Sequence, residues 1–281
     1  MKVLVIGSGT MGTGISQLLM ASDVVDELYI YSRSSDKLKH LFSTCLNNLE
    51  RMVNKGKLDA NVLVTAKNKV KLASNFQCVE VVDLVIEAIS ESYEAKFELI
   101  DNIAARLPEN TIFASNTSSL SITALAAKLP KPENAVGLHF FNPAPLMELV
   151  EVVQGFVTSE RVVSEMLAFA KKLGKSPVIV NEGPGFVVNR MLIPMINEAI
   201  CILADAVASK EDIDKSMMLG AHHPMGPLKL SDLIGNDVVL SIMDTLYQET
   251  GDSKYRANSL LRKMVRANHL GRKTKQGFYS Y

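Results

Sequence analysis

A histidine and a glutamate in neighbouring apolar stretches could together carry out general acid–base chemistry. His139 lies in the β-prone run Ala135–Phe141, and Glu151 lies in a second such run, Met147–Val153. The connection between the runs is too short for a crossover helix, so the two strands should pair antiparallel. If the turn centres on Pro145, His139 and Glu151 are equally far from it and lie directly opposite each other on one face.

A histidine held by a carboxylate is the usual construction of a general base. The carboxylate fixes the tautomer of the imidazole and stabilises the imidazolium that forms when the base takes a proton. Glu148 would pair near Asn142 instead, which makes it the weaker partner. A single histidine in an apolar strand is more often structural, so the expected pairing with Glu151 is what favours a catalytic interpretation.

The residues Gly7-Ser8-Gly9-Thr10-Met11-Gly12 form a glycine-rich turn directly after the apolar run Val3–Ile6 and before a helical stretch. In this setting the first glycine permits a tight turn and the second lets the backbone approach a pyrophosphate. The third glycine lets the helix pack closely on the strand. Free N–H groups at the start of the helix then face the anion. The turn therefore predicts a dinucleotide site rather than a turn without a ligand.

The choice between NAD and NADP depends on the residues that follow the second strand, Leu28–Tyr31. An NAD site normally places Asp or Glu there to accept hydrogen bonds from both ribose hydroxyls. This chain has Ser32 and Arg33 instead, with Lys37 one turn further on. Ser32 can donate to a 2′-phosphate, and the guanidinium of Arg33 fits phosphate oxygens. We therefore predict NADP; the alternative is that Arg33 is a solvated surface residue and NAD binds through Ser32 alone.

Two further polar residues have positions that suit substrate binding. Ser118 follows the expected strand Ile112–Ala114, at the strand end where ligands bind in open α/β sheets. The alternative role for Ser118 is a helix cap for the segment that starts near Ile122. Asn189 lies one turn into the first helix of the second domain, so we expect it to face the cleft between the domains. An amide among apolar side chains needs a partner if it is buried.

The order of the elements indicates what must position these residues. Up to Val180, short β-branched runs alternate with amphipathic stretches, which implies a parallel sheet covered on both faces. Besides the antiparallel pair, strands are expected at Val3–Ile6, Leu28–Tyr31, Leu84–Glu87, Ile112–Ala114 and Val178–Val180, and helices at Ser16–Ala21, Lys37–Val53, Glu94–Arg106 and Glu160–Leu173. After a turn-rich break near Gly183 the periodicity is helical only. We predict an α/β protein with a Rossmann-type doubly wound sheet and an added antiparallel strand pair over residues 1–183, followed by an all-helical substrate and dimerisation domain over residues 184–281.

Composition argues against several classes of function. Lys and Arg number 30 and Asp and Glu also number 30, so the neutral balance gives no electrostatic case for a nucleic-acid or membrane-surface protein. The most apolar stretch, 186–208, is interrupted by too many polar residues to span a bilayer, and we expect a cytoplasmic protein. The three cysteines are far apart and should be free thiols. Adjacent His222 and His223 cannot both face one ion on a helix, so we predict no metal site.

These motifs together resemble those of the L-3-hydroxyacyl-CoA dehydrogenases, and most closely those of the short bacterial 3-hydroxybutyryl-CoA group. The resemblance covers essentially the whole chain. It includes, in order, GSGTMGTGI, DLVIEAISE, ASNTSSLSIT, GLHFFNPAPLMELVEVV, PGFVVNRMLIPMINEA, HHPMGPL and GRKTKQGFY. It implies a nucleotide domain followed by an all-helical domain that forms a homodimer. The implied activity is reversible hydride transfer between a nicotinamide cofactor and the pair acetoacetyl-CoA and 3-hydroxybutyryl-CoA.

The resemblance also implies roles for individual residues. His139 would be the catalytic base with Glu151 as its partner. Ser118 and Asn189 would hold the C3 oxygen and the thioester region of the substrate. The residues expected along the nicotinamide half of the cofactor are Glu91, Lys96 and Asn142. Arg51 and Lys55 match basic positions that grip the CoA phosphates in bacterial members, and a solvated basic face is the competing explanation for them.

One departure from the family pattern concerns the cofactor, because members that use NAD carry Asp where this chain has Ser32. The departure supports the prediction of NADP. A competing interpretation is a β-hydroxyacid dehydrogenase of the phosphogluconate type, which uses a helix Lys at the position comparable to Asn189. Another is a non-catalytic relative like the lens crystallins. The presence of both His139 and Glu151 argues against both alternatives.

Overall fold

The computed structural model describes residues 1–281. The chain folds into two compact units, Met1–Gly183 and Pro184–Tyr281, and each has its own apolar core. None of the helices combines the length and the apolar character that a membrane span needs.

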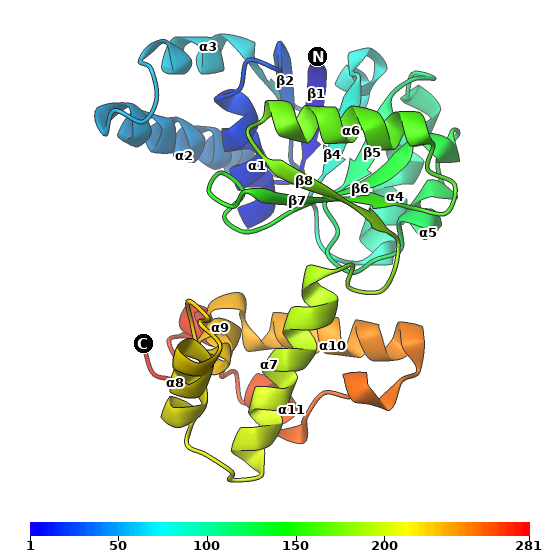
Figure 1. The fold of residues 1–281 in the computed structure, drawn as a ribbon. Coiled ribbons are helices and arrows are strands. Elements are labelled where there is room, and N and C mark those ends of the chain that lie inside the picture. Colours follow the sequence, from blue (N-terminus) through cyan, green and yellow to red (C-terminus); the bar gives the residue numbers. More distant parts are fainter. The chain divides into compact units, whose positions relative to one another are not determined.

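The first unit is built on one eight-stranded sheet, ordered β3-β2-β1-β4-β5-β6-β7-β8 (Figure 1). Neighbouring strands pair parallel except β6 and β7, which pair antiparallel. The strands are β1 (Lys2–Ile6), β2 (Glu27–Tyr31), β3 (Val70–Ala73), β4 (Leu84–Glu87), β5 (Ile112–Ser115), β6 (Ala135–Phe140), β7 (Leu149–Gln154) and β8 (Ser176–Asn181). This topology confirms the predicted doubly wound sheet with an added antiparallel pair.

Helices cover both faces of the sheet, because successive side chains of a strand point to opposite faces. In β1, Val3 and Val5 belong to an apolar cluster with α1, α2 and α6, whereas Leu4 and Ile6 belong to a cluster with α4 and α5 (Figure 1). The helices are α1 (Thr10–Met20), α2 (Ser35–Asn54), α3 (Asn61–Lys69), α4 (Tyr93–Ile103), α5 (Ile122–Ala126) and α6 (Glu160–Lys172), with short 3₁₀ turns at Phe76–Val81, Ala104–Arg106 and Pro132–Asn134.

Two differences from the expected elements have local causes. Helix α1 begins at Thr10 rather than at Ser16, because its first turns contain Gly12 and Gly14, whose low helix propensity hides the helical pattern. Helix α3 and strand β3 were not expected. Strand β3 is a four-residue edge strand with no buried side chain, so it lacks the apolar alternation by which strands are recognised.

The second unit is helical throughout, as predicted. Its helices are α7 (Val188–Ala204), α8 (Lys210–Gly220), α9 (Pro227–Ile234), α10 (Asn236–Thr250) and α11 (Ser259–Arg266), with 3₁₀ turns at Ser253–Tyr255 and Arg272–Thr274. They enclose a single apolar cluster. In this cluster the aliphatic side chains of α7 pack with those of α10 and α11, and with Phe278 from the final segment of the chain.

A buried carboxylate on α9 holds the final segment of the chain in place. Asp232 is 1% exposed and accepts hydrogen bonds from the backbone N–H groups of Phe278 at 3.0 Å and Tyr279 at 2.9 Å. It also accepts from the amide of Asn236 at 3.0 Å. The backbone approaches so closely at Gly277 that a Cβ there would lie 1.9 Å from the Asp232 carboxylate. Only a glycine at position 277 lets the backbone come this close to the carboxylate of Asp232.

We expect Asp232→Ala to destabilise the protein by about 3 kcal/mol, because it leaves several buried N–H groups without an acceptor. Urea and thermal unfolding of the variant measure the loss. Asp205→Ala is the matched control, since Asp205 is an exposed residue of the same unit and its carboxylate has no hydrogen-bond partner. A free energy of unfolding for Asp232→Ala equal to that of the control would contradict this role.

Candidate active site

The glycine-rich turn between β1 and α1 is shaped by its glycines. Gly7 has φ +128°, and a Cβ there would lie 2.3 Å from the carbonyl oxygen of Ala88. A Cβ on Gly12 would lie 2.1 Å from the carbonyl oxygen of Gly7, so this glycine allows the helix to pack on the turn. At Gly9, by contrast, an added Cβ would meet nothing within 4 Å. The open space beside Gly9 and the N-terminus of α1 suits a pyrophosphate.

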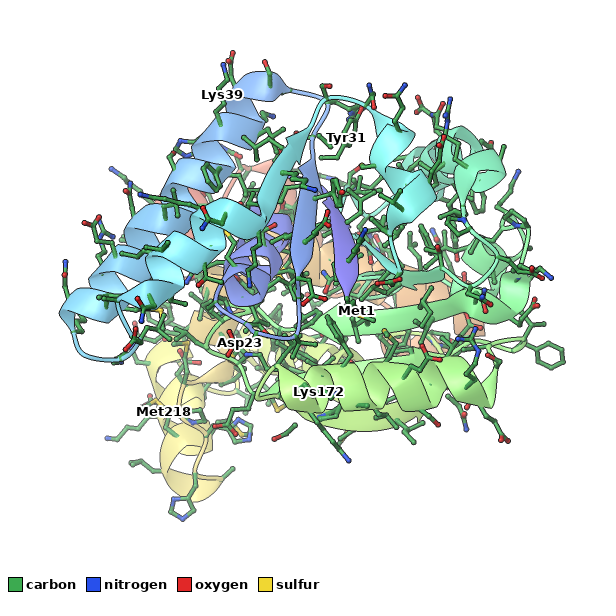
Figure 2. All side chains as sticks on the ribbon, turned by 90° about the horizontal axis from the view of Figure 1, so that it is seen from above. Met1, Asp23, Tyr31, Lys39, Lys172 and Met218 are labelled. Atoms are coloured by element: carbon green, nitrogen blue, oxygen red, sulfur yellow. The ribbon has the colours of Figure 1, made fainter.

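A cavity of about 770 Å³ opens beside this turn. The turn and the end of β2 form one side, and α4 forms another through Ala95, Glu98, Leu99 and Asn102. The ring of Tyr31, at the end of β2, packs against the ring of Phe76, with centroids 4.2 Å apart. Figure 2 shows Tyr31 at the end of its strand. The cavity therefore has the position, the size and the aromatic wall that an adenine nucleotide needs.

The residues predicted to determine the preference for NAD or NADP line this cavity. The hydroxyl groups of Ser32 and Ser8 lie 2.7 Å apart, so a hydrogen bond joins the end of β2 to the glycine-rich turn. Arg33 and Lys37 are exposed at the rim of the cavity. The hydroxyl of Ser34 accepts a hydrogen bond from the N–H of Lys37 and caps α2. Two cations, Arg33 and Lys37, therefore line the cavity where β2 gives way to α2, and Asp36 in the first turn of α2 is not part of that lining.

A buried ion pair lies at the end of β4. The ammonium of Lys96, 1% exposed, lies 2.7 and 2.8 Å from the two carboxylate oxygens of Glu87, which is fully buried. Glu87 also accepts hydrogen bonds from the hydroxyl of Ser115 at 2.6 Å and the N–H of Ile89 at 2.7 Å. Sequence reasoning missed Glu87 and Ser115. Two adjacent strands each ending in a polar residue, Glu87 and Ser115, were the available signal.

Glu91 connects this ion pair to the loop that follows β5. One of its oxygens lies 3.4 Å from Lys96 Nζ, and the other accepts from Thr117 Oγ1 and from the N–H of Ser118, each at 2.7 Å. Burial raises the pKa of Glu91, but Lys96 and the hydrogen bonds from Thr117 and Ser118 outweigh that effect and leave the pKa below its usual value. Glu91 is thus held ionised, and it fixes Ser118 at the carboxyl edge of the sheet.

Glu91 and Lys96, which the resemblance placed along the cofactor, are paired in the structure but differ in exposure. Glu91 has a side chain that is 35% exposed, and it can still reach a ligand. Lys96 is enclosed between Glu87 and Glu91, with little surface left for a direct contact. In this arrangement Lys96 can act on a ligand through Glu91.

His139 and Glu151 lie opposite each other in the observed register of β6 and β7, as the loop length predicts. Their side chains are 8% and 0% exposed, and Nδ1 of the histidine lies 2.7 Å from a carboxylate oxygen of the glutamate. The neighbouring Leu138 and Phe140 belong to the apolar cluster with α1 and α6, so His139 points to the other face of the sheet. The ring of Phe141 packs on the imidazole, with centroids 4.5 Å apart.

An asparagine missed by sequence reasoning braces this strand. The side-chain oxygen of Asn116, in the loop after β5, accepts a hydrogen bond from the N–H of Phe140 at 2.9 Å. The contact joins the loop that carries Ser118 to the strand that carries His139. A polar residue at the end of a parallel strand was the only signal for it.

The remaining predicted residues belong to other parts of the chain. Asn142 is an exposed residue at the start of the β6–β7 loop. Arg51 and Lys55 are exposed at the C-terminal end of α2, a helix whose N-terminus is at the nucleotide cavity. With about 1.5 Å of rise per residue, they lie about 25 Å along the helix from that cavity. Asn189 belongs to α7, in the second unit.

Comparison with known proteins identifies the family. Residues 2–183 match the model of the 3-hydroxyacyl-CoA dehydrogenase NAD binding domain, and residues 185–281 match the model of the C-terminal domain of the same enzymes. The chain is 49% identical to a 3-hydroxybutyryl-CoA dehydrogenase of Clostridioides difficile, over 100% of this chain and 99% of the relative. It is 38% identical to the human mitochondrial hydroxyacyl-coenzyme A dehydrogenase, over 99% of this chain and 90% of that protein.

Solved structures agree with the sequence matches. The crystal structure of (S)-3-hydroxybutyryl-CoA dehydrogenase from Ralstonia eutropha is similar to this chain with a TM-score of 0.95 and 42% identity, covering 100% of this chain and 98% of the other. Both domain models and full-length relatives well above 30% identity thus point the same way. The chain belongs to the 3-hydroxyacyl-CoA dehydrogenase family.

Proposed function

We propose that this protein is a short-chain L-3-hydroxyacyl-CoA dehydrogenase that interconverts 3-hydroxybutyryl-CoA and acetoacetyl-CoA. The observation that carries the proposal is the buried contact of 2.7 Å between His139 and Glu151 in the dinucleotide-binding unit. The names of the full-length relatives from Clostridioides difficile and Ralstonia eutropha support the choice of substrate.

The geometry of the pair defines how a proton moves. Because Nδ1 of His139 faces the Glu151 carboxylate, Nδ1 carries the proton in the neutral imidazole and Nε2 is the basic nitrogen. In oxidation, Nε2 takes the proton of the C3 hydroxyl as hydride leaves C3. The buried carboxylate stabilises the imidazolium that results. In reduction, the imidazolium returns the proton to the alkoxide that forms at C3.

The cofactor and the other polar residues have complementary tasks. A bound nicotinamide supplies the hydride acceptor in oxidation and the donor in reduction. Ser118, held by Glu91, would hold the C3 oxygen and the thioester region of the substrate together with Asn189. The exposed cations Arg51 and Lys55 would bind the CoA phosphates.

We further propose that the cofactor is NADP. Ser32 places a hydroxyl where a carboxylate would repel a 2′-phosphate, and Arg33 and Lys37 bring two positive charges to the rim of the same cavity. The alternative, NAD, would leave both cations without a 2′-phosphate to bind.

A homodimer formed through the helical unit completes the proposal. The resemblance to the family suggests it, and the helical unit exposes large apolar side chains. Val207 is 73% exposed, Met191 72% and Leu219 69%. Burying such groups between two copies would be favourable. Sedimentation equilibrium should give twice the mass of the chain, and a monomer at micromolar concentration would contradict the proposal.

Replacing the base tests the mechanism. We expect His139→Gln to lower kcat for acetoacetyl-CoA reduction about 10³-fold, because the amide cannot donate a proton to the alkoxide. Affinity for the CoA ester should change little. Glu151→Gln should cost less than His139→Gln but still at least about tenfold. Near-normal turnover by His139→Gln would rule out its assignment as the base.

Cofactor choice can be tested with the wild-type enzyme and one variant. We expect kcat/KM with acetoacetyl-CoA to be higher with NADPH than with NADH. Arg33→Ala should lower the NADPH value about tenfold and leave the NADH value nearly unchanged, because only the 2′-phosphate contact is lost. Lys39→Ala is the matched control: Lys39 is exposed on α2, outside the cavity residues (Figure 2). Equal or better efficiency of the wild type with NADH would overturn the choice of NADP.

A further inference from the structure

A buried lysine that the mechanism does not use lies beneath the loop between the two catalytic strands. Lys175 directly precedes β8 and is 8% exposed. Its ammonium donates to the backbone carbonyl oxygens of Ala144 at 2.7 Å, Met147 at 2.8 Å and Pro145 at 3.3 Å. All three acceptors belong to the connection between β6 and β7. All three N–H donors of the ammonium therefore form hydrogen bonds with a single loop.

The charge of Lys175 has no buried counterion. The ammonium forms no ion pair, and burial lowers the pKa of Lys175, an effect that the negative charge of Glu148 opposes only in part. A buried cation satisfied by neutral carbonyls alone is costly. A residue that served only to fill space could be apolar at this position. The arrangement therefore indicates that the loop needs an ammonium to keep its carbonyls pointing inward.

The loop stands between the dinucleotide helix and the catalytic strands. Its Ala144 is 1% exposed and packs against Gly14 in α1, where an added Cβ would lie 3.3 Å from the Ala144 Cβ and 3.4 Å from Pro145. The loop begins at Asn142, three residues after His139. A shift of the loop would therefore move Asn142 relative to both the glycine-rich turn and the imidazole.

We propose that Lys175 is a positioning residue that fixes the 142–148 loop so that Asn142 meets the nicotinamide half of the dinucleotide. This inference rests on the proposed function and on the place beside the nicotinamide that the family resemblance implies for Asn142. Lys175 itself touches neither ligand and acts through the three carbonyl groups that it holds. Within the loop, the N–H groups of Leu146 and Met147 donate to the carbonyl of Pro143, and at its end the N–H of Ser176 donates to the carbonyl of Glu148. Lys175 adds three hydrogen bonds to the part of the loop between them.

The decisive experiment compares ligands with and without the nicotinamide. Lys175→Met keeps an unbranched apolar stem, one atom shorter than the lysine side chain, and removes the three donors. Isothermal titration should show at least about tenfold weaker binding of NADH and NADPH, since small displacements of a positioning group are costly. ADP-ribose and its 2′-phosphorylated form lack the nicotinamide, and they should bind as they do to the wild type.

A purely structural role for Lys175 gives a different result. If Lys175→Met only destabilised the fold, the melting temperature and the fraction of folded protein would fall. Binding of the dinucleotides and of the ADP-ribose ligands would then weaken equally or remain unchanged. Equal losses for NADH and ADP-ribose, or unchanged binding of both, would overturn the proposal. Lys172→Met is the matched control, because Lys172 is exposed on α6 three residues earlier (Figure 2). It should bind every ligand like the wild type.

Two provisions keep the test decisive. If Lys175→Met does not yield folded protein, Lys175→Gln replaces it; the glutamine lacks the charge and is too short to hold all three carbonyls, so the same selective loss of dinucleotide binding is expected. Unchanged dinucleotide binding by that variant would overturn the proposal equally. The titrations contain no CoA ester, so a wild type that binds NADPH but does not reduce acetoacetyl-CoA would refute the proposed function and leave the result for Lys175 standing.

Discussion

The antiparallel pairing of β6 with β7 is the constraint on which the candidate site depends. Leu138 and Phe140 on one strand and Val150 and Val152 on the other are buried in the same apolar cluster. Sliding one strand by a single residue would turn its apolar side chains away from that cluster, so burial fixes the register. The same register places a histidine opposite a glutamate on the other face. Apolar packing on one face of the strand pair thereby determines which polar residues face each other on the opposite face.

Buried charges then organise the edge of the sheet around this pair, and each is satisfied in a different way. Glu87 and Lys96 form a buried ion pair. Lys96 also lies beside Glu91, which accepts a hydrogen bond from the loop that carries Ser118. Lys175 instead has only backbone carbonyls. Such groups are costly where hydrophobic side chains would do, and they are tolerated where they define the position of a loop. The loops that they fix are the two that flank His139.

Most of the architecture was predictable because its strands are buried. Apolar runs such as Val3–Ile6 and Leu84–Glu87 are recognised easily, and the observed strands differ from them by a residue at most. Elements without a buried face were missed, as β3 shows, since an exposed edge strand has no alternation to detect. The start of α1 was misplaced because glycines required by close packing with the turn are poor helix formers.

The sequence by itself determined the dinucleotide turn, the sheet class and the pairing of His139 with Glu151, because these follow from local patterns and a short loop. It could not reveal the burial of Lys96, the brace from Asn116 or the carbonyl cage around Lys175. The brace from Asn116 and the hydrogen bonds of Lys175 join segments about 24 to 31 residues apart, and the burial of Lys96 depends on how α4 packs against the sheet. Only the folded sheet brings such groups within hydrogen-bond distance, because a polar residue at a strand end does not by itself indicate which partner it will meet.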